Sequence, residues 1–435
     1  MRFPLLAKVA ALAAVMLSLI WALDSVSRIV VERQGRLHEA QHSIAESLST
    51  AQSLLGPVLQ RACTETWDMQ QGEGKDRKTV TERRDFVLKA VPRRLTVEAT
   101  SLTEPRYRGI FRVNAYALDA RLAAEWPDLN ALQPRREHPN SRLQCEPPRM
   151  WVAVSDTRGI RSARITLQDH ERDALPGTGV TNAEHAFQAT WPAGVGLEAA
   201  PVRASIALEL VGTEKLAFAP IGEATEVKLS SNWPHPSFGG RFLPAQREVR
   251  EDGFDARWLL SSLASRAPQQ LGDGFTLCRP DESAFRPSDS GKGVERCIET
   301  FGVSFIDPVS PYLLSDRATK YGLLFIALTF VAVALVEVMR RLRVHPVQYL
   351  LVGCALTLFF LLLVSLSEHI PFGWAYLAAS AACTALLTFY GIHILRGARA
   401  GLVFGAGLSA LYGALYVLLL REQSALVLGA VLLFT

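Results

Sequence analysis

A proline-rich aromatic segment, Asn232-Trp233-Pro234-His235-Pro236, is the most unusual candidate site in the polar part of the chain. Its two prolines favour an extended backbone. Trp233 and His235, with Phe238 shortly after them, would then form an aromatic surface that receives an envelope protein or a glycan. The alternative is a rigid turn whose Trp233 fills the core of a β domain. The sequence alone leaves both open.

Two ionisable residues in long apolar runs, Glu337 and His393, are candidates for a polar site within a membrane. Ionisable side chains inside a bilayer often serve transport or proton transfer. Each of the two, however, lies three positions before an arginine, Arg340 or Arg396, which indicates the end of a helix. The alternative is therefore a location at the membrane interface, where Glu337 would pair with an arginine of its own helix.

Four of the six cysteines lie in the polar region, and the other two lie in apolar runs. An even number favours two disulfides if the polar region sits in an oxidising compartment. The expected pairs join Cys63 to Cys145 and Cys278 to Cys297. Four reduced thiols are the alternative.

No other group of residues predicts a reaction. The G-x-S-x-G turn of many hydrolases is missing, and Gly177-Thr178-Gly179 is too short for a nucleotide-binding loop. The histidines are dispersed, so we expect neither a metal site nor a cofactor. The net charge is only +4 and the basic residues are scattered, which argues against nucleic acid as a partner. We expect a protein that is not an enzyme.

Five apolar segments approach the roughly 20 residues that a helix needs to cross a hydrocarbon core. The first, residues 1–23, lacks a small-residue cleavage pattern at its end, so we expect an uncleaved membrane anchor. The others form an expected C-terminal bundle, residues 319–435, with spans at 322–339, 349–366, 371–395 and 401–420. Residues 424–435 are apolar but too few to span, and we expect them to begin a further helix.

The polar region between them, residues 24–318, is expected to form a β-rich domain. Residues 24–56 repeat apolar side chains about every 3.6 positions as far as Gly56-Pro57, which predicts a helical stalk or a helix folded back on the domain. Later stretches alternate apolar and polar residues, which predicts antiparallel, sandwich-like sheets. The expected buried sets include Phe111, Val113, Ala115 and Ala117, and Ala204, Ile206, Leu208 and Leu210.

The distribution of arginines predicts which side of the membrane each loop occupies. Clusters follow the second and fourth spans, at Arg340, Arg341 and Arg343 and at Arg396 and Arg399. Five spans in alternation place both clusters on the same side as the basic N-terminus, as the positive-inside rule requires. The domain between the first two spans is therefore expected on the external side.

Several strings of the sequence resemble the CreD family of bacterial inner-membrane proteins. They are SNWPHPSF at 231–238, FLPA at 242–245, DRATKY at 316–321, HPVQYLLVG at 345–353 and LSEH at 366–369. The resemblance implies a bacterial inner membrane, a periplasmic β domain and a role in cell-envelope integrity, under the control of a sensor kinase and response regulator. It carries over no catalytic residue. It also implies a sixth membrane helix, which residues 424–435 would begin.

Together these features favour a multi-pass membrane protein that acts in envelope integrity as a non-catalytic scaffold or a stress-responsive sensor. The expected partners are membrane lipids, with envelope proteins or glycans. One alternative is a transporter or channel for an envelope component. Another is a membrane-embedded enzyme of envelope metabolism.

Overall fold

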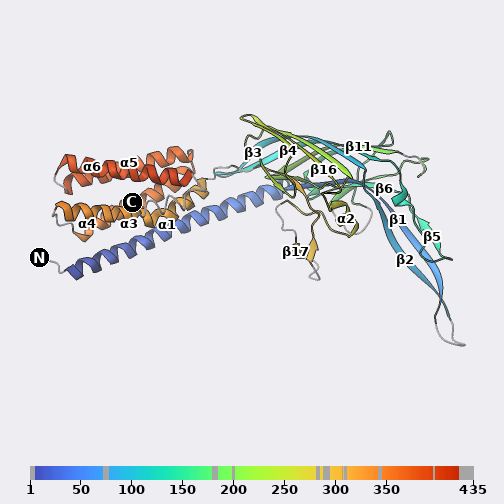
Figure 1. The fold of residues 1–435 in the computed structure, drawn as a ribbon, viewed down its shortest axis with the longest axis horizontal. Coiled ribbons are helices and arrows are strands. Elements are labelled where there is room, and N and C mark those ends of the chain that lie inside the picture. The colour runs from blue at the N-terminus through green and yellow to red at the C-terminus, as the bar shows by residue number, and fades with distance from the viewer. Residues whose placement is uncertain are drawn as a thin grey trace. The chain divides into compact units, whose positions relative to one another are not determined.

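A computed structural model of the chain has apolar helices towards both ends of the sequence and a large β domain between them (Figure 1). It describes residues 5–71, 78–178, 185–197, 201–280, 285–287, 294–305, 307, 311–340, 345–394 and 397–420. The chain divides into a helical unit, Met1–Glu39 with Pro308–Thr435, and a β unit, Ala40–Asp307. The expected limits of 24 and 318 differ, because one helix continues through residue 24 and another begins before residue 319.

Within the described residues, five helices are long and apolar enough to cross a membrane. They are α1 (Leu5–Ser47), α3 (Pro311–Arg340), α4 (Pro346–Ser367), α5 (Phe372–Ile394) and α6 (Ala398–Leu420). Each predicted span overlaps one of these helices. The second candidate span begins at Leu314 rather than at residue 322, because the polar residues there are accommodated along the helix: Lys320 pairs with Asp316 at 2.6 Å. Residues 424–435 lie outside the described part of the chain.

Aromatic side chains and close helix contacts hold the helical unit together. Phe359 on α4 and Tyr412 on α6 have ring centroids 4.6 Å apart, and the Tyr376 hydroxyl donates to the carbonyl of Tyr412 at 2.6 Å. Gly405 lies so close to Thr388 that an added Cβ would clash with its hydroxyl. Small residues that let helices approach closely are typical of membrane bundles.

The prediction that the first helix runs to residue 56 is wrong beyond Ser47. Strand β1 (Gln52–Gln71) follows after a short connection. Gly56-Pro57 interrupts the pairing of β1 with β6 (Arg149–Val154), where the register shifts between Leu55 and Val58. Gly56 has a φ of +124° and faces the backbone of Val152, which leaves little room for a side chain. The Gly-Pro pair therefore marks an irregularity in a strand, not the end of a helix.

Two large sheets build the β unit. The first has the order β14-β19-β12-β1-β6-β10-β9, with β2 and β5 also paired to β1. Its other strands are β2 (Lys78–Ala90), β5 (Arg142–Cys145), β6 (Arg149–Val154), β9 (Leu175–Pro176), β10 (Ala186–Thr190), β12 (Lys215–Phe218), β14 (Ser237–Gly240) and β19 (Phe301–Ser304).

The second sheet has the order β15-β16-β13-β3-β4-β11-β7-β8. Its strands are β3 (Arg94–Arg108), β4 (Phe111–Trp126), β7 (Ile160–Leu167), β8 (His170–Arg172), β11 (Val202–Thr213), β13 (Ala224–Ser231), β15 (Gln246–Arg250) and β16 (Gly253–Ser261). Smaller elements are α2 (Ala267–Gly272) and the pair β17 (Phe285–Pro287) and β18 (Val294–Arg296). Most pairings are antiparallel, while β1 with β12 and β3 with β13 are parallel.

Both sheets contribute to one hydrophobic core, which includes Leu54 and Val152 from the first and Ile206 and Val227 from the second. The expected sandwich-like fold class is thus confirmed. Along β11 the expected residues are the buried ones, because the strand alternates regularly from Val202 to Leu210.

The expected buried face of β4 is wrong in part. Ala117 is exposed, whereas Asn114 and Tyr116 are buried together with Val113 and Ala115. The two polar side chains are buried because they have partners inside the unit. The Asn114 amide donates to the carbonyl of Phe305 at 2.8 Å, and the Tyr116 hydroxyl donates to the carbonyl of Lys215 at 2.8 Å. Alternation by polarity alone could not show these bonds.

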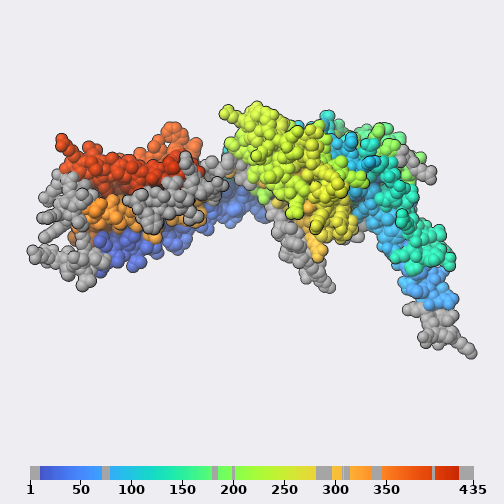
Figure 2. Space-filling view, in the orientation of Figure 1, coloured from blue at the N-terminus to red at the C-terminus, as the bar shows by residue number. Residues whose placement is uncertain are grey.

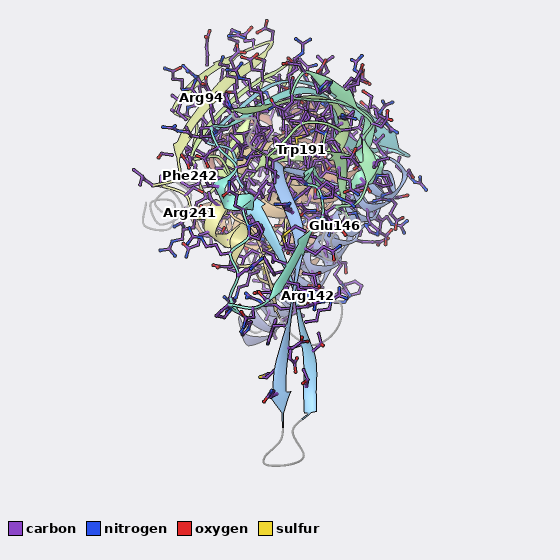
Figure 3. All side chains as sticks on the ribbon, turned by 90° about the vertical axis from the view of Figure 1, so that its right-hand side faces the viewer. Arg94, Arg142, Glu146, Trp191, Arg241 and Phe242 are labelled. Atoms are coloured by element: carbon purple, nitrogen blue, oxygen red, sulfur yellow. A yellow bond between two sulfur atoms is a disulfide. The ribbon has the colours of Figure 1, made fainter. Side chains whose placement is uncertain are left out.

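Strands β1 and β2 form an arm that projects from the rest of the β unit (Figures 1 and 2). They pair from Leu59 with Ala90 outward to Gln71 with Lys78. Strand β5 supports the other edge of β1 only from Cys63 to Thr66. Figure 3 shows the two strands continuing beyond Arg142, the first residue of β5.

Candidate functional site

The proline-rich segment brings two of its three predicted aromatic side chains into the core. Trp233 is only 7% exposed, and its indole N–H donates to the carbonyl of His235 at 2.9 Å. Phe238 is half-buried, with ring centroids 5.5 Å from Phe254 and 5.7 Å from Trp258. His235 is exposed. The indole can be buried because its polar atom has a partner within the segment itself, so the geometry corresponds to the rigid turn rather than to an open aromatic surface.

Both expected disulfides are present in the structure. Cys63 and Cys145 face each other as partners in the β1–β5 ladder, with Cα atoms 4.1 Å apart. Cys278 and Cys297 close a shorter loop, with Cα atoms 5.4 Å apart. Cys354 and Cys383 are free thiols of the helical unit. All four bonded cysteines therefore belong to the β unit.

A buried carboxylate, Glu65, lies two residues along the arm from Cys63. Its side chain accepts hydrogen bonds from the backbone N–H groups of Glu137 and His138, at 3.0 and 3.1 Å, and from the Ser141 hydroxyl at 2.5 Å. The bonds from Ser141 and His138 hold the pKa of the Glu65 carboxyl below its usual value. The His138 ring stacks on Trp67 at 4.0 Å. Glu65 thus fixes the loop before β5 against the base of the arm.

A second carboxylate, Asp156, joins the end of α1 to the start of β1. It is 5% exposed and accepts from the backbone N–H of Thr50 at 3.0 Å and from the guanidinium of Arg158 at 2.7 Å. Arg158 also donates to the carbonyl of Glu46, in the last turn of α1, at 2.8 Å. Burial raises the pKa of Asp156, but the hydrogen bonds from Arg158 and Thr50 outweigh it, and the pKa lies well below the usual range.

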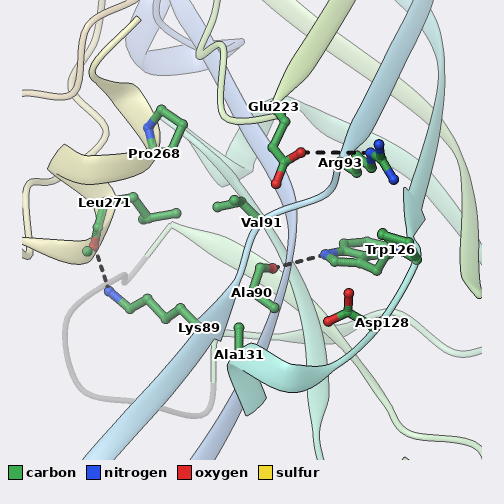
Figure 4. Close-up of a pocket in the computed structure, with 12 residues that line it drawn as sticks. Lys89, Ala90, Val91, Arg93, Trp126, Asp128, Ala131, Glu223, Pro268 and Leu271 are labelled. Atoms are coloured by element: carbon green, nitrogen blue, oxygen red, sulfur yellow. Dashed lines mark hydrogen bonds and ion pairs between the residues drawn. The ribbon is translucent and has the colours of Figure 1, made fainter. Parts of the chain in front are cut away.

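A pocket of about 270 Å³ lies beside β2, the start of β3 and α2 (Figure 4). The Lys89 ammonium donates to the carbonyl of Leu271 at 2.9 Å, and Arg93 lies 3.9 Å from the Glu223 carboxylate. The buried Trp126 also lines it. Burial lowers the pKa of Lys89. The charges of this pocket are engaged with the protein itself, and none of the residues singled out from the sequence lines it.

The two predicted intramembrane residues have different partners. The Tyr349 hydroxyl on α4 donates to the Glu337 carboxylate on α3 at 2.9 Å. The His393 ring is exposed, and its Nδ1 lies 2.9 Å from the Phe389 carbonyl of the same helix. Glu337 thus connects two helices, while His393 interacts along its own helix. The pairing of Glu337 with Tyr349 was not apparent from the sequence, because the two residues are twelve positions apart on different helices.

One motif was overlooked in the sequence. His38-Glu39-Ala40-Gln41-His42 has the H-E-x-x-H spacing of many zinc peptidases. Both histidines are exposed on α1, and His42 pairs with Glu46 at 3.1 Å. A catalytic zinc needs a third protein ligand, and across the described residues no three His, Cys, Asp or Glu side chains gather closely enough to hold a metal. The simplest interpretation is a solvated helix face.

Comparisons with known proteins agree with the resemblance seen in the sequence. The family described as "Inner membrane protein CreD" matches residues 4–435. The Inner membrane protein CreD of Escherichia coli (strain K12) is 34% identical over 430 residues, which cover 99% of this chain and 90% of that protein.

Solved structures give only a weak likeness. An M1 zinc metallopeptidase from Deinococcus radiodurans aligns over 39% of this chain and 38% of that chain, at 10% identity and a TM-score of 0.21. A likeness of this size supports no conclusion about fold or activity. The match over nearly the whole sequence, by contrast, is decisive, and the chain belongs to the CreD family of inner membrane proteins.

Proposed function

We propose that this protein maintains the integrity of the cell envelope as a non-catalytic scaffold or stress-responsive sensor, with its β unit in the periplasm. The observation that supports the periplasmic location is the pair of disulfides within the β unit. Disulfides persist in the periplasm and are rare in the bacterial cytosol. The β unit lies in the sequence between two candidate membrane spans, so an external location is consistent with the chain's topology.

The distribution of basic residues supports the same orientation. The N-terminus carries Arg2 and Lys8, and the connection after α3 carries Arg341 and Arg343. One membrane span separates the N-terminus from the β unit, and another separates the β unit from the connection after α3. Both basic segments therefore lie across a membrane from the β unit. Short loops rich in arginine and lysine remain in the cytoplasm, which leaves the β unit outside.

The polar networks of the β unit support a scaffold rather than a catalyst. Among its described residues two carboxylates are buried, Glu65 and Asp156, and both accept hydrogen bonds from backbone N–H groups of the same unit. A general acid or base needs a carboxyl whose pKa lies near the working pH, whereas the pKa values of both residues are lowered. These groups thus suit the fixing of loops and strands.

Alkaline phosphatase fusions test the location. A fusion after Arg250, within the β unit, should be active, and a fusion after Arg343 should be inactive. The reverse pattern would overturn the orientation.

Purification of the full chain in native lipid particles, followed by mass spectrometry, tests the role. A stoichiometric envelope protein would support a scaffold or sensor. A tightly bound lipid-linked sugar without a protein partner would favour transport instead. A strain that lacks the protein provides the second readout: if its sensitivity to detergents equals that of the parent strain, the role in envelope integrity is wrong.

A further inference from the structure

The β3–β4 hairpin ends in a tip, residues 104–112, that the β unit does not bury. Strand β3 alternates between buried and exposed residues up to Thr103 and is fully exposed from Glu104 to Arg108. Tyr107 is 65% exposed and Ile110 is 48% exposed. The turn between the strands is made by Gly109, whose φ is +59°. Large apolar side chains thus stand at the end of a hairpin, where the described part of the β unit leaves them about half or more exposed.

The same tip carries an excess of positive charge. Its sequence, EPRYRGIFR, contains Arg106, Arg108 and Arg112 against one acid, Glu104. Arg106 pairs with Glu104 at 3.2 Å, and both side chains are more than half exposed. In the part of the chain that the structure describes, no ion pair involves Arg108. An exposed pair of this kind is weak and can be replaced by another anion at little cost.

A second hairpin of the same sheet shows that this excess is not a general property of its turns. Strand β15 is exposed along its whole length. Its Arg250, however, pairs with three carboxylates, Glu248 at 3.0 Å, Asp252 at 3.6 Å and Asp255 at 2.5 Å. Arg250 is therefore paired with acids of its own hairpin, whereas in the tip Glu104 is the one acid for three arginines, and Arg112 lies near Asp307, which is outside the tip.

The covalent chain limits how far the tip can lie from a membrane. Phe305 is opposite Asn114, and Asp307 lies 4.0 Å from Arg112. Asp307 therefore lies nearer the tip than Phe305 does. Helix α3 begins at Pro311, four residues later, and these residues span about 14 Å at most. The tip thus belongs to the end of the β unit from which the chain enters a membrane span.

We propose that this hairpin tip binds the anionic phospholipid surface of the bilayer that the protein spans. Guanidinium groups form paired, charge-assisted hydrogen bonds with phosphate. Tyrosine side chains favour the membrane interface, where one end is apolar and the other is hydrated. Together, Arg106, Arg108 and Arg112 would interact with headgroups while Tyr107 and Ile110 enter the interface. The inference requires the membrane location of the family and is independent of the role proposed above.

Quenching of a fluorophore by lipids tests the contact in the full-length protein. In a Cys354→Ser background, Ile110→Cys is labelled with a polarity-sensitive dye, and the protein is placed in nanodiscs whose lipids carry a quencher at the headgroup region. The matched control carries the dye at Leu263→Cys, a 98% exposed position on the loop after β16. We expect quenching at 110 in phosphatidylcholine discs that contain phosphatidylglycerol, and none at 263.

Charge variants separate lipid binding from simple proximity. Each basic residue near an anionic surface strengthens binding about fivefold. Changing all three arginines of the tip to Gln should therefore weaken the binding of the tip to the lipid surface about 100-fold. Arg247→Gln on β15 should leave the quenching unchanged. Raised salt should weaken the wild-type contact. Two results would overturn the proposal and favour a protein partner. In the first, the dye at 110 is quenched no more than the dye at 263. In the second, the dye at 110 is quenched equally in discs with and without anionic lipid.

Discussion

Replacing the buried Asp156 by Asn should destabilise the β unit. The carboxylate is the shared acceptor for the Thr50 backbone N–H and for the Arg158 guanidinium, and Arg158 in turn binds the last turn of α1. The amide of Asn is neutral and presents one acceptor oxygen in place of two. At least one donor therefore loses its partner inside the unit.

The size of the effect follows from the exposure of the partners. Hydrogen bonds to a charged group contribute about 1.5–3 kcal/mol each. The Arg158 side chain is 53% exposed, so water replaces part of what it loses. We expect Asp156→Asn to lower the free energy of unfolding by about 2–3 kcal/mol, and the melting temperature of the β unit by about 5–10 °C.

The effect should also depend on pH, in a direction set by the lowered pKa of Asp156. A carboxyl whose folded pKa is lowered stabilises the fold above its unfolded value of about 3.9 and loses that contribution as the pH falls. The difference in stability between the wild type and Asp156→Asn should therefore be constant from about pH 5 to pH 8 and narrow below about pH 4.

Tryptophan fluorescence of the full chain in nanodiscs, followed through urea unfolding, would measure both effects. Asp169→Asn is the matched control: it makes the same chemical change at an exposed turn with a φ of 61°, which Asn accepts readily. The control should change the stability by less than about 0.5 kcal/mol. The reasoning is refuted if the two variants are equally stable, or if the effect of Asp156→Asn is as large at pH 3 as at pH 7.

Two further predictions concern the arm and the disulfides. The Cys63–Cys145 bond joins residues 82 positions apart, and the Cys278–Cys297 bond joins residues 19 positions apart. From the chain entropy of these loops we expect the free energy of unfolding to fall by about 4.5 kcal/mol when the first pair is changed to serine, and by about 3 kcal/mol for the second. The same unfolding assay checks the order, and a larger loss for the shorter loop would contradict it. Glu65→Ala should release the loop at 137–141 and lower the free energy of unfolding by about 2–4 kcal/mol. Limited proteolysis should then cut that loop faster. An unchanged rate of cleavage would show that Glu65 does not hold the loop.

The parts of the fold that could be predicted are those in which one physical effect dominates. Long apolar runs mark membrane helices, because no other environment accepts so many apolar side chains in sequence. Regular alternation along β11 predicted its buried face. The strand lies between β4 and β7 in one sheet, so its side chains point alternately to the core and to the other face of the sheet. The four cysteines of the polar region allowed the correct pairs, although spacing alone could not show that Cys63 and Cys145 are ladder partners.

The parts that could not be predicted depend on contacts between distant residues. Gly56-Pro57 has the composition of a helix end, yet it lies within β1, which pairs with β6 on both sides of it. Trp233 is buried because its indole N–H meets a carbonyl two residues away. Glu65 and Asp156 look like ordinary surface carboxylates in the sequence, and only the structure shows the backbone N–H groups that surround them.

The error on β4 is informative about the proposed membrane contact. Alternation predicted that the strand would bury Phe111, but Phe111 is only partly buried, and Ile110, on the other face of the alternation, is 48% exposed. The burial that the pattern predicts is thus incomplete at Phe111 and complete at Val113 and Ala115. An apolar pattern without a protein core to bury it indicates that something outside the β unit covers these residues. The charges beside them, and a chain that enters a membrane helix four residues after Asp307, favour a lipid surface as that cover.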